Sequence, residues 1–225
     1  MSSPQNSTDA QQVRSCGDCS LCCKVMEIAT LGKPPGSWCW NCKPPRGCTV
    51  YADRPRECEN FNCLWLINPK LGEEWKPSRC KMVLVTDLGG SRLIAHVDPQ
   101  QPDAWKRLPY YAMLKDWARR SASFRGQVIA AIGRRMFMIF PDRDIDLGVV
   151  GLDEFIVVNE VETPTGLRLE AAKVGRDDPR APIPEECRLG WSVAAGDPLP
   201  QQAGVAVGVA DDAAFAVEDH RRALL

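Results

Sequence analysis

The chain has 225 residues, of which 44% are hydrophobic and 25% are charged, as is typical of a soluble globular protein with an apolar core. Its 28 lysine and arginine residues face 29 aspartate and glutamate residues, a net charge of −1. This balance predicts neither a nucleic-acid partner nor an anionic membrane partner. No apolar run approaches the roughly 20 residues that a membrane-spanning helix needs.

Residues 1–14 are predicted to be a disordered lead-in, because they are polar and show no hydrophobic periodicity. They also lack the apolar centre of a signal peptide. We therefore expect a cytoplasmic protein, whose thiols are kept reduced by glutathione and thioredoxin.

Cysteines dominate the region that follows, which we assign to residues 15–80. Nine of the eleven cysteines lie between positions 16 and 63, and these candidate metal ligands are Cys16, Cys19, Cys22, Cys23, Cys39, Cys42, Cys48, Cys58 and Cys63. An odd total would leave one thiol unpaired in a purely disulfide-bonded framework. Compartment and spacing together favour metal binding over disulfides, which remain the alternative for a protein exported by another route.

The cysteine-rich region contains two Pro-Pro loops, at Pro34-Pro35 and Pro44-Pro45, which exclude long regular elements. Leu21–Ile28 is predicted to form a short helix. The region has too few aliphatic residues for a core of its own, so it needs cross-links through metal or sulfur.

Residues 81–175 are predicted to form an antiparallel sheet with one main helix. Three hairpins are expected, over residues 82–97, 127–140 and 154–174, because apolar runs flank short turn sequences. The helix is expected to begin near Pro109, with an apolar stripe at Tyr110, Met113, Leu114 and Trp117. Consecutive apolar residues in several strands predict a sheet that is covered on both faces.

The predicted fold class is therefore α+β: a cysteine-rich, metal-binding N-terminal lobe packed on an antiparallel β-sheet with one main helix. Trp105 and Trp117 are expected to pack the helix onto the sheet, whereas Trp38, Trp40, Trp65 and Trp75 could shield a metal centre. Residues 176–225 form a Pro-, Ala- and Asp-rich segment. Its end, residues 200–225, is either a strand with a short helix or a mobile tail.

The cysteine spacing supports two kinds of metal centre. Cys16-x2-Cys19 and Cys39-x2-Cys42 together could form a four-sulfur zinc site. Cys16, Cys19 and Cys22 instead follow the C-x2-C-x2-C spacing of ferredoxins, in which three thiolates bind a [4Fe-4S] cluster and the fourth ligand comes from elsewhere. An iron-sulfur cluster or zinc is thus the expected cofactor.

Other cysteines and their neighbours leave the number of metals open. Side chains of the adjacent Cys22 and Cys23 point apart, which suggests two metals, a polynuclear centre or one spare thiol. Cys80 and Cys187 are expected to be ordinary thiols. Arg54 and Arg56 lie just before Cys58 in the sequence. They either lower the pKa of its thiol or are solvated loop residues.

Two linked motifs resemble the YkgJ-type cysteine-cluster family, which is described as carrying a zinc- or iron-chelating CxxCxxCC domain. The first is Cys16-x2-Cys19-x2-Cys22-Cys23, and the second is Gly47-Cys48-Thr49-Val50-Tyr51-x2-Arg54-Pro55-x2-Cys58-x2-Phe61-x-Cys63. The resemblance covers about residues 14 to 66 and implies that the seven cysteines of the motifs are ligands. Cys39 and Cys42 look like additions to the family pattern.

No reaction follows from these patterns, and no catalytic residue is assigned. His96 is expected to have a structural role, His220 to be solvated, and Asp142, Asp144 and Asp146 to form a charged turn rather than a calcium loop. Three functions stay open: a metal-binding protein with a redox role, a zinc-stabilised module for an unknown protein partner, and a protein-modifying enzyme. The last follows from the resemblance, because flagellin lysine methylases share a cluster of this kind.

Overall fold

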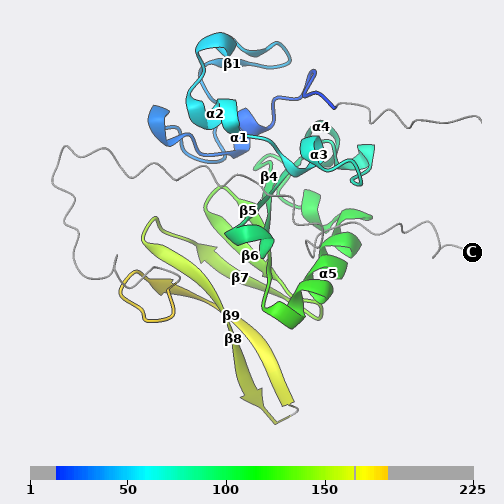
Figure 1. The fold of residues 1–225 in the computed structure, drawn as a ribbon, viewed down its shortest axis with the longest axis vertical. Helices are drawn as coiled ribbons and strands as arrows, with labels where there is room; N and C mark the ends of the chain where they lie inside the picture. The colour runs from blue at the N-terminus through cyan, green and yellow to red at the C-terminus, as the bar shows by residue number, and fades with distance from the viewer. Residues whose placement is uncertain (1–13, 165, 182–225) are drawn as a thin grey trace, which may run out of the picture.

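The computed structural model describes residues 14–164 and 166–181, in which a cysteine-rich lobe lies beside a mixed sheet with one main helix (Figure 1). The helices are α1 (Cys22–Val25), α2 (Arg56–Asn60), α3 (Leu64–Ile67), α4 (Pro77–Cys80) and α5 (Tyr110–Ser121). The strands are β1 (Cys42–Lys43), β2 (Gly47–Cys48), β3 (Met82–Asp87), β4 (Arg92–Val97), β5 (Gln127–Ile132), β6 (Arg135–Ile139), β7 (Asp144–Val149), β8 (Glu154–Thr163) and β9 (Gly166–Gly175). The predictions for residues 1–13, Cys187, His220 and the segment 200–225 lie outside the described residues.

The main sheet has the strand order β3-β4-β5-β6-β7. The expected hairpins β3–β4, β5–β6 and β8–β9 are confirmed, as is the helix that follows Pro109. The prediction of a wholly antiparallel sheet is wrong, because β4 and β5 pair in parallel with Arg92 opposite Gln127. The chain between them contains α5, and such a crossover returns the next strand to the end at which the previous one started.

The acidic segment after Phe140 was expected to be a charged turn, and this prediction is wrong from Asp144 onward. Asp144 begins β7, which pairs antiparallel with β6 at the edge of the sheet. Asp146 forms an ion pair with Arg135 of β6. Asp146 is exposed on this edge strand, where a charged side chain is tolerated.

One face of the sheet forms the larger core with α5. Leu114 and Trp117 of the helix are buried there, and the Trp117 ring lies 5.1 Å from that of Trp75. Trp105 lies 5.5 Å from Phe137 of β6, so the expected role of Trp105 and Trp117 in packing helix onto sheet is confirmed.

Trp65 and Trp75 belong to this same core, although they were expected to shield a metal centre. Trp65 lies on α3, and Trp75 directly precedes α4. Their segments carry the chain from the cysteine-rich lobe into the core of the sheet.

The opposite face of the sheet is covered in part by the β8–β9 hairpin. Ile94, Ile129 and Met138 of the sheet pack there with Ile156 of β8. The central strands are thus covered on both faces, as their apolar runs predict. The far half of the hairpin projects from the body (Figure 1), where Val161 and Leu167 are exposed.

Ile129→Val should lower the free energy of unfolding by about 0.5–1.5 kcal/mol, because one methyl group is lost from a fully buried site. Leu167→Ala on the exposed part of the hairpin should change it by less than about 0.5 kcal/mol. Urea unfolding followed by tryptophan fluorescence compares the two. Equal effects would show that β5 is not at the centre of the core.

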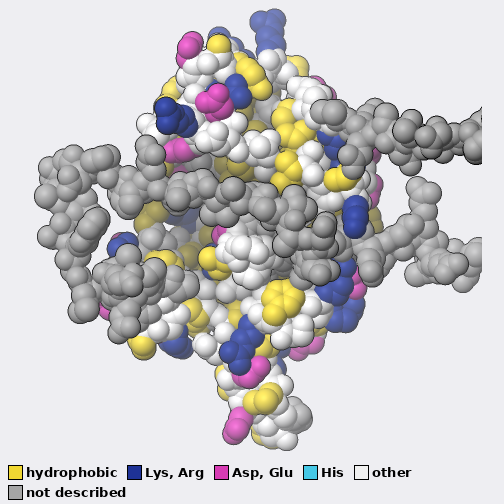
Figure 2. Space-filling model, in the orientation of Figure 1, with side chains coloured by type: hydrophobic (Ala, Val, Ile, Leu, Met, Phe, Trp, Pro, Cys, Tyr) yellow, Lys and Arg dark blue, Asp and Glu magenta, His cyan; other side chains and the backbone are white. Residues whose placement is uncertain are grey.

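Charged side chains of both signs are interspersed on the visible face of the molecule (Figure 2). Exposed ion pairs such as Arg125–Glu160 and Arg176–Asp153 belong to this pattern. Pairs of this kind contribute little to stability.

Candidate metal centre

The described cysteines around helix α1 differ in what they pack against, although the Cys22 and Cys23 thiols contact each other and Cys16 lies near Cys23. The neighbouring residues Cys22 and Cys23 of this helix face different surroundings: Cys22 packs against the large core, and Cys23 packs against a small cluster formed by Ile28, Cys39 and Cys42. The inner thiol group consists of Cys16, Cys19, Cys22, Cys63 and Cys80. The outer thiol group consists of Cys23, Cys39, Cys42, Cys48 and Cys58.

Backbone contacts assemble the outer thiol group from three segments. The Cys39 amide donates a hydrogen bond of 2.9 Å to the Cys23 carbonyl, and the Cys42 amide donates one of 2.9 Å to the Cys39 carbonyl. Cys42 and Cys48 are directly opposite in the small β1–β2 hairpin. Cys58, on α2, packs against the same buried cluster.

The inner thiol group also combines three segments. The Cys19 amide donates a 2.9 Å hydrogen bond to the Cys16 carbonyl, which closes a tight turn between these two residues. Cys63 directly precedes α3, and Cys80 is the last residue of α4. Cys19, Cys22, Cys63 and Cys80 all pack in the large core.

Arg14 fixes the start of the cysteine motif to the segment that follows Cys63. Its guanidinium donates hydrogen bonds to the carbonyls of Trp65 at 2.7 Å, Asn68 at 2.8 Å and Leu71 at 2.5 Å. It also lies over the Trp65 ring, 5.0 Å from the centroid. Arg14 falls in the predicted lead-in, and its role could not be read from the sequence because its partners are more than 50 residues away in the chain.

Two lysines of the lobe are buried, and one of them, Lys24, reaches the chain after β4. Lys24 of α1 places its Nζ 2.5 Å from Asp98 Oδ1 and 2.9 Å from Gln100 Oε1, both just after β4. Lys33 donates hydrogen bonds to the carbonyls of Lys24, at 2.9 Å, and Met26. Burial lowers the pKa of Lys33, while the nearby thiols of Cys39, Cys23, Cys22 and Cys58 act in the opposite direction.

Most of these thiols are held in the neutral form. Burial raises the pKa of Cys42 and of Cys80 to about 12, and it raises the pKa of Cys16, Cys58 and Cys63 as well. The contact with Cys22, followed by burial, raises the pKa of Cys23. Any metal that binds here must therefore displace protons from the thiols.

The chemistry of this donor set fits zinc or iron, which both bind thiolates. None of the ten described cysteines is in a disulfide. Their geometry fits less well: within residues 14–164 and 166–181, no three histidine, cysteine, aspartate or glutamate side chains are placed to hold a metal ion together. The fold brings the thiols into two groups, but the sulfurs do not converge on one point.

Trp38, Trp40 and Arg54 of the lobe do not have the surroundings that the sequence predicts. Trp38 and Trp40 are exposed. The Arg54 guanidinium stacks over the Tyr51 ring, 4.0 Å from its centroid. Arg54 and Lys76 lower the pKa of Cys16, against the larger effect of its burial. The expected influence of Arg54 on a thiol is thus found at Cys16.

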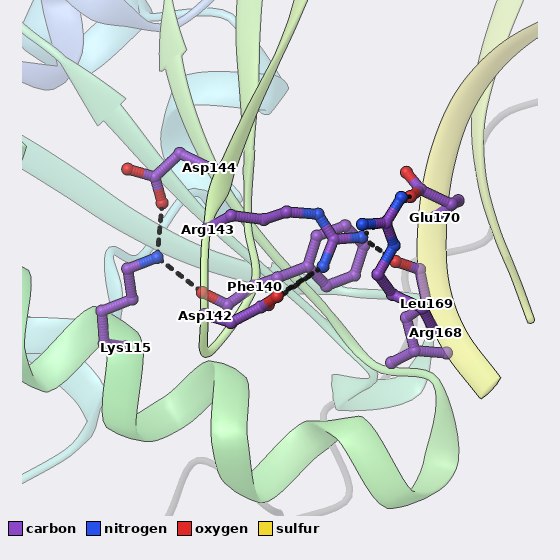
Figure 3. A network of polar contacts seen from close by, with 8 residues as sticks. All are labelled: Lys115, Phe140, Asp142, Arg143, Asp144, Arg168, Leu169 and Glu170. Atoms are coloured by element: carbon purple, nitrogen blue, oxygen red, sulfur yellow. Dashed lines mark hydrogen bonds and ion pairs between the residues drawn. The ribbon is translucent and has the colours of Figure 1, made fainter. Parts of the chain in front are cut away.

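A second polar constellation lies far from the thiols, between α5 and the β8–β9 hairpin (Figure 3). Lys115 pairs with Asp144 at 2.8 Å, and Arg143 pairs with Asp142 at 2.8 Å and with Glu170 at 3.2 Å. A shallow pocket beside it is lined by Phe140, Asp142 and Arg143 together with hairpin residues 167–169. The cations are all matched by carboxylates, so this network serves to join the hairpin to the body.

His96 lies in β4, opposite Val83 of β3 and Ala131 of β5. Burial lowers its pKa to about 4, whereas an unfolded histidine has a pKa of about 6.5. As the pH falls, His96 is therefore protonated at a higher pH in the unfolded chain than in the folded protein.

The free energy of unfolding should decrease between about pH 6.5 and pH 4 by up to about 3 kcal/mol through His96 alone. His96→Gln should abolish this part of the pH dependence. The measurement is the difference between wild type and variant in urea unfolding at pH 7 and pH 4.5. A difference that does not change with pH would contradict a His96 that stays neutral in the folded protein.

No protein-family model, no curated protein and no solved structure matches this chain. Of the helices in the described part of the chain, none has the length and apolar character needed to cross a membrane. The resemblance to the YkgJ-type family therefore stays a prediction from the cysteine motifs.

Proposed function

We propose that this chain is a metal-binding protein whose N-terminal lobe coordinates an iron-sulfur cluster, or else zinc, through cysteine thiolates. The observation that carries the proposal is that eight of the ten described cysteines pack in two clusters that meet at the short helix α1, and that none of the ten is in a disulfide. Segments that are up to 64 residues apart in the chain contribute to these groups, from Cys16 to Cys80.

The surroundings of the thiols suit a centre of negative charge. Lys33 is buried beside the outer thiol group, and Lys76 and Arg54 act on Cys16. Cations near several thiolates offset their mutual repulsion. A bound zinc ion would stabilise the fold of the lobe, whereas an iron-sulfur cluster would in addition transfer electrons.

The C-x2-C-x2-C run from Cys16 to Cys22 and the excess of thiols favour an iron-sulfur cluster over zinc. We expect this chemistry in the cytoplasm, without a nucleic-acid or membrane partner. The alternative of a protein-modifying enzyme depends on the motif resemblance alone, and the described residues add no observation in its favour.

Metal analysis and an absorption spectrum of protein purified without air test the proposal. We expect brown protein that contains iron and acid-labile sulfide. Colourless protein with bound zinc would retain metal binding and replace the redox role by a structural lobe that presents a surface to a partner protein. Protein that contains neither metal, with its thiols free, would contradict the proposal.

A further inference from the structure

We infer that Cys23 and Cys42 form a site of reversible thiol–disulfide exchange, whose substrates are small disulfides such as oxidised glutathione. The oxidised lobe carries a disulfide that joins helix α1 to the β1–β2 hairpin. Both cysteines are free in the structure, which therefore represents the reduced form of this site. The inference needs only contact between two sulfurs, so it goes beyond the proposed function and does not rest on it.

Backbone hydrogen bonds place Cys23 and Cys42 side by side, although 19 positions separate them in the chain. The Cys39 amide donates to the Cys23 carbonyl, and the Cys42 amide donates to the Cys39 carbonyl, each at 2.9 Å. The Cys23 side chain packs against the buried cluster that contains Cys42, and the two thiols are in hydrogen-bond contact. A bond between these sulfurs therefore replaces a contact that the fold already makes.

Cys22 also contacts the Cys23 thiol, but it is an unsuitable partner for a disulfide. The peptide bond between these neighbours is trans, and Cα atoms are about 3.8 Å apart across a trans peptide. The Cα atoms of a disulfide are usually about 4.4–6.8 Å apart. The two residues also open helix α1, whose backbone a bond between neighbours would distort. Oxidation should therefore join Cys23 to Cys42.

Cys48 is the other alternative, because it lies directly opposite Cys42 in the β1–β2 hairpin. The contacts of the Cys42 thiol, however, are with the Cys23 thiol and with Ser20. Cys48 lies close enough to Cys58 to act on that thiol electrostatically. The Cys42 thiol thus faces α1 rather than its partner across the hairpin.

The exposure of the two thiols assigns their order in the reaction. Cys23 is partly exposed, whereas Cys42 is only 8% exposed. The Cys23 thiolate attacks one sulfur of glutathione disulfide, the S–S bond of glutathione breaks, and one glutathione leaves as its thiol. The Cys42 thiolate then attacks the Cys23 sulfur and releases the second glutathione. The protein pair loses two electrons and two protons, and the two glutathione molecules take them up.

The raised pKa of both thiols affects the rate of this exchange, because the thiolate is the attacking form. The charge of the buried Lys33 acts on Cys23 in the opposite direction. The position of the equilibrium is set by the reduction potentials of the two pairs. We therefore expect slow exchange that reaches equilibrium on long incubation.

Tryptic peptides of the oxidised full-length chain test the inference. The chain is purified without air, its metal content is measured, and it is incubated with excess glutathione disulfide and with EDTA to keep metal off the thiols. After free thiols are blocked, trypsin places Cys23 in peptide 15–24 and Cys42 in peptide 25–46, since Lys33 and Lys43 each precede a proline and resist cleavage. These two peptides should be cross-linked, with two hydrogen atoms missing, and dithiothreitol should separate them.

Cys23→Ser and Cys42→Ser should each abolish this cross-link. Cys22→Ser and Cys48→Ser, which remove the neighbouring thiols, are the matched controls and should retain it. Fragmentation of the cross-linked peptides locates the bond in the wild type itself, so the assignment does not depend on the folding of a variant.

A wild-type chain that stays reduced, or that carries glutathione on Cys23 without the cross-link, would overturn the inference. A cross-link between peptides 25–46 and 47–56 would do the same, because it would join Cys42 to Cys48. The metal content before EDTA is added tests the proposed function separately. Metal-free protein that forms the cross-link would contradict the proposed function alone, and metal-containing protein that does not form it would contradict the exchange site alone.

Discussion

Cys19→Ser should remove metal from the inner thiol group and loosen the segment around it. In small metal domains the free energy of metal binding is folding free energy, of the order of 10 kcal/mol for structural zinc. The measurements are metal content and amide hydrogen exchange.

Exchange should accelerate at the Cys19 amide, which bonds to Cys16, more than at the Cys39 amide, which bonds to Cys23 in the outer group. Cys187→Ser is the control, and it should leave metal content unchanged. Equal metal loss in Cys19→Ser and Cys187→Ser would contradict the assignment of ligands.

Lys24→Met should lower the free energy of unfolding by about 3–5 kcal/mol, because it leaves the Asp98 carboxylate buried without its cation. The side chains of this pair are only 4% and 11% exposed, and the Nζ–Oδ1 distance is 2.5 Å. The pair joins α1 to the chain that leaves β4. Its loss should therefore also weaken the attachment of the lobe to the sheet.

Urea unfolding at equal metal content measures this effect. Arg135→Met, which removes an exposed ion pair with Asp146, is the control and should cost less than about 1 kcal/mol. Adding Asp98→Asn to Lys24→Met should restore part of the loss, because an amide carries no charge to bury. If Lys24→Met and Arg135→Met had the same small effect, the pair would not hold the lobe in place.

The local elements of this fold can be predicted from the sequence. The hairpin at Gly133-Arg134 follows from a two-residue turn between apolar runs, and α5 follows from its apolar stripe after Pro109. The parallel pairing of β4 with β5 cannot be read in the same way, because it depends on the path of the chain through α5. The edge strand β7 was missed because its aspartates resemble a turn, whereas Arg135 on the neighbouring strand accommodates Asp146.

The cysteine motifs predict which residue types gather but not where each thiol faces. Spacing alone pairs Cys16-x2-Cys19 with Cys39-x2-Cys42, whereas the fold packs Cys19 in the large core and Cys39 and Cys42 in the small cluster. Cys80 joins the inner thiol group because α4 and β3 bring it into the core with Cys63. No local sequence motif predicts this position. Lys24 and Asp98, 74 residues apart, are likewise joined only by the tertiary fold.

The most direct test of metal binding is the mass of the intact chain, compared between native and denaturing conditions, for protein purified without air. The account predicts a native mass above that of the 24.9 kDa chain by the mass of its metal, with any sulfide. It also predicts a denatured mass that corresponds to fully reduced cysteines. Equal native and denatured masses, with two hydrogen atoms missing for each disulfide, would contradict the account.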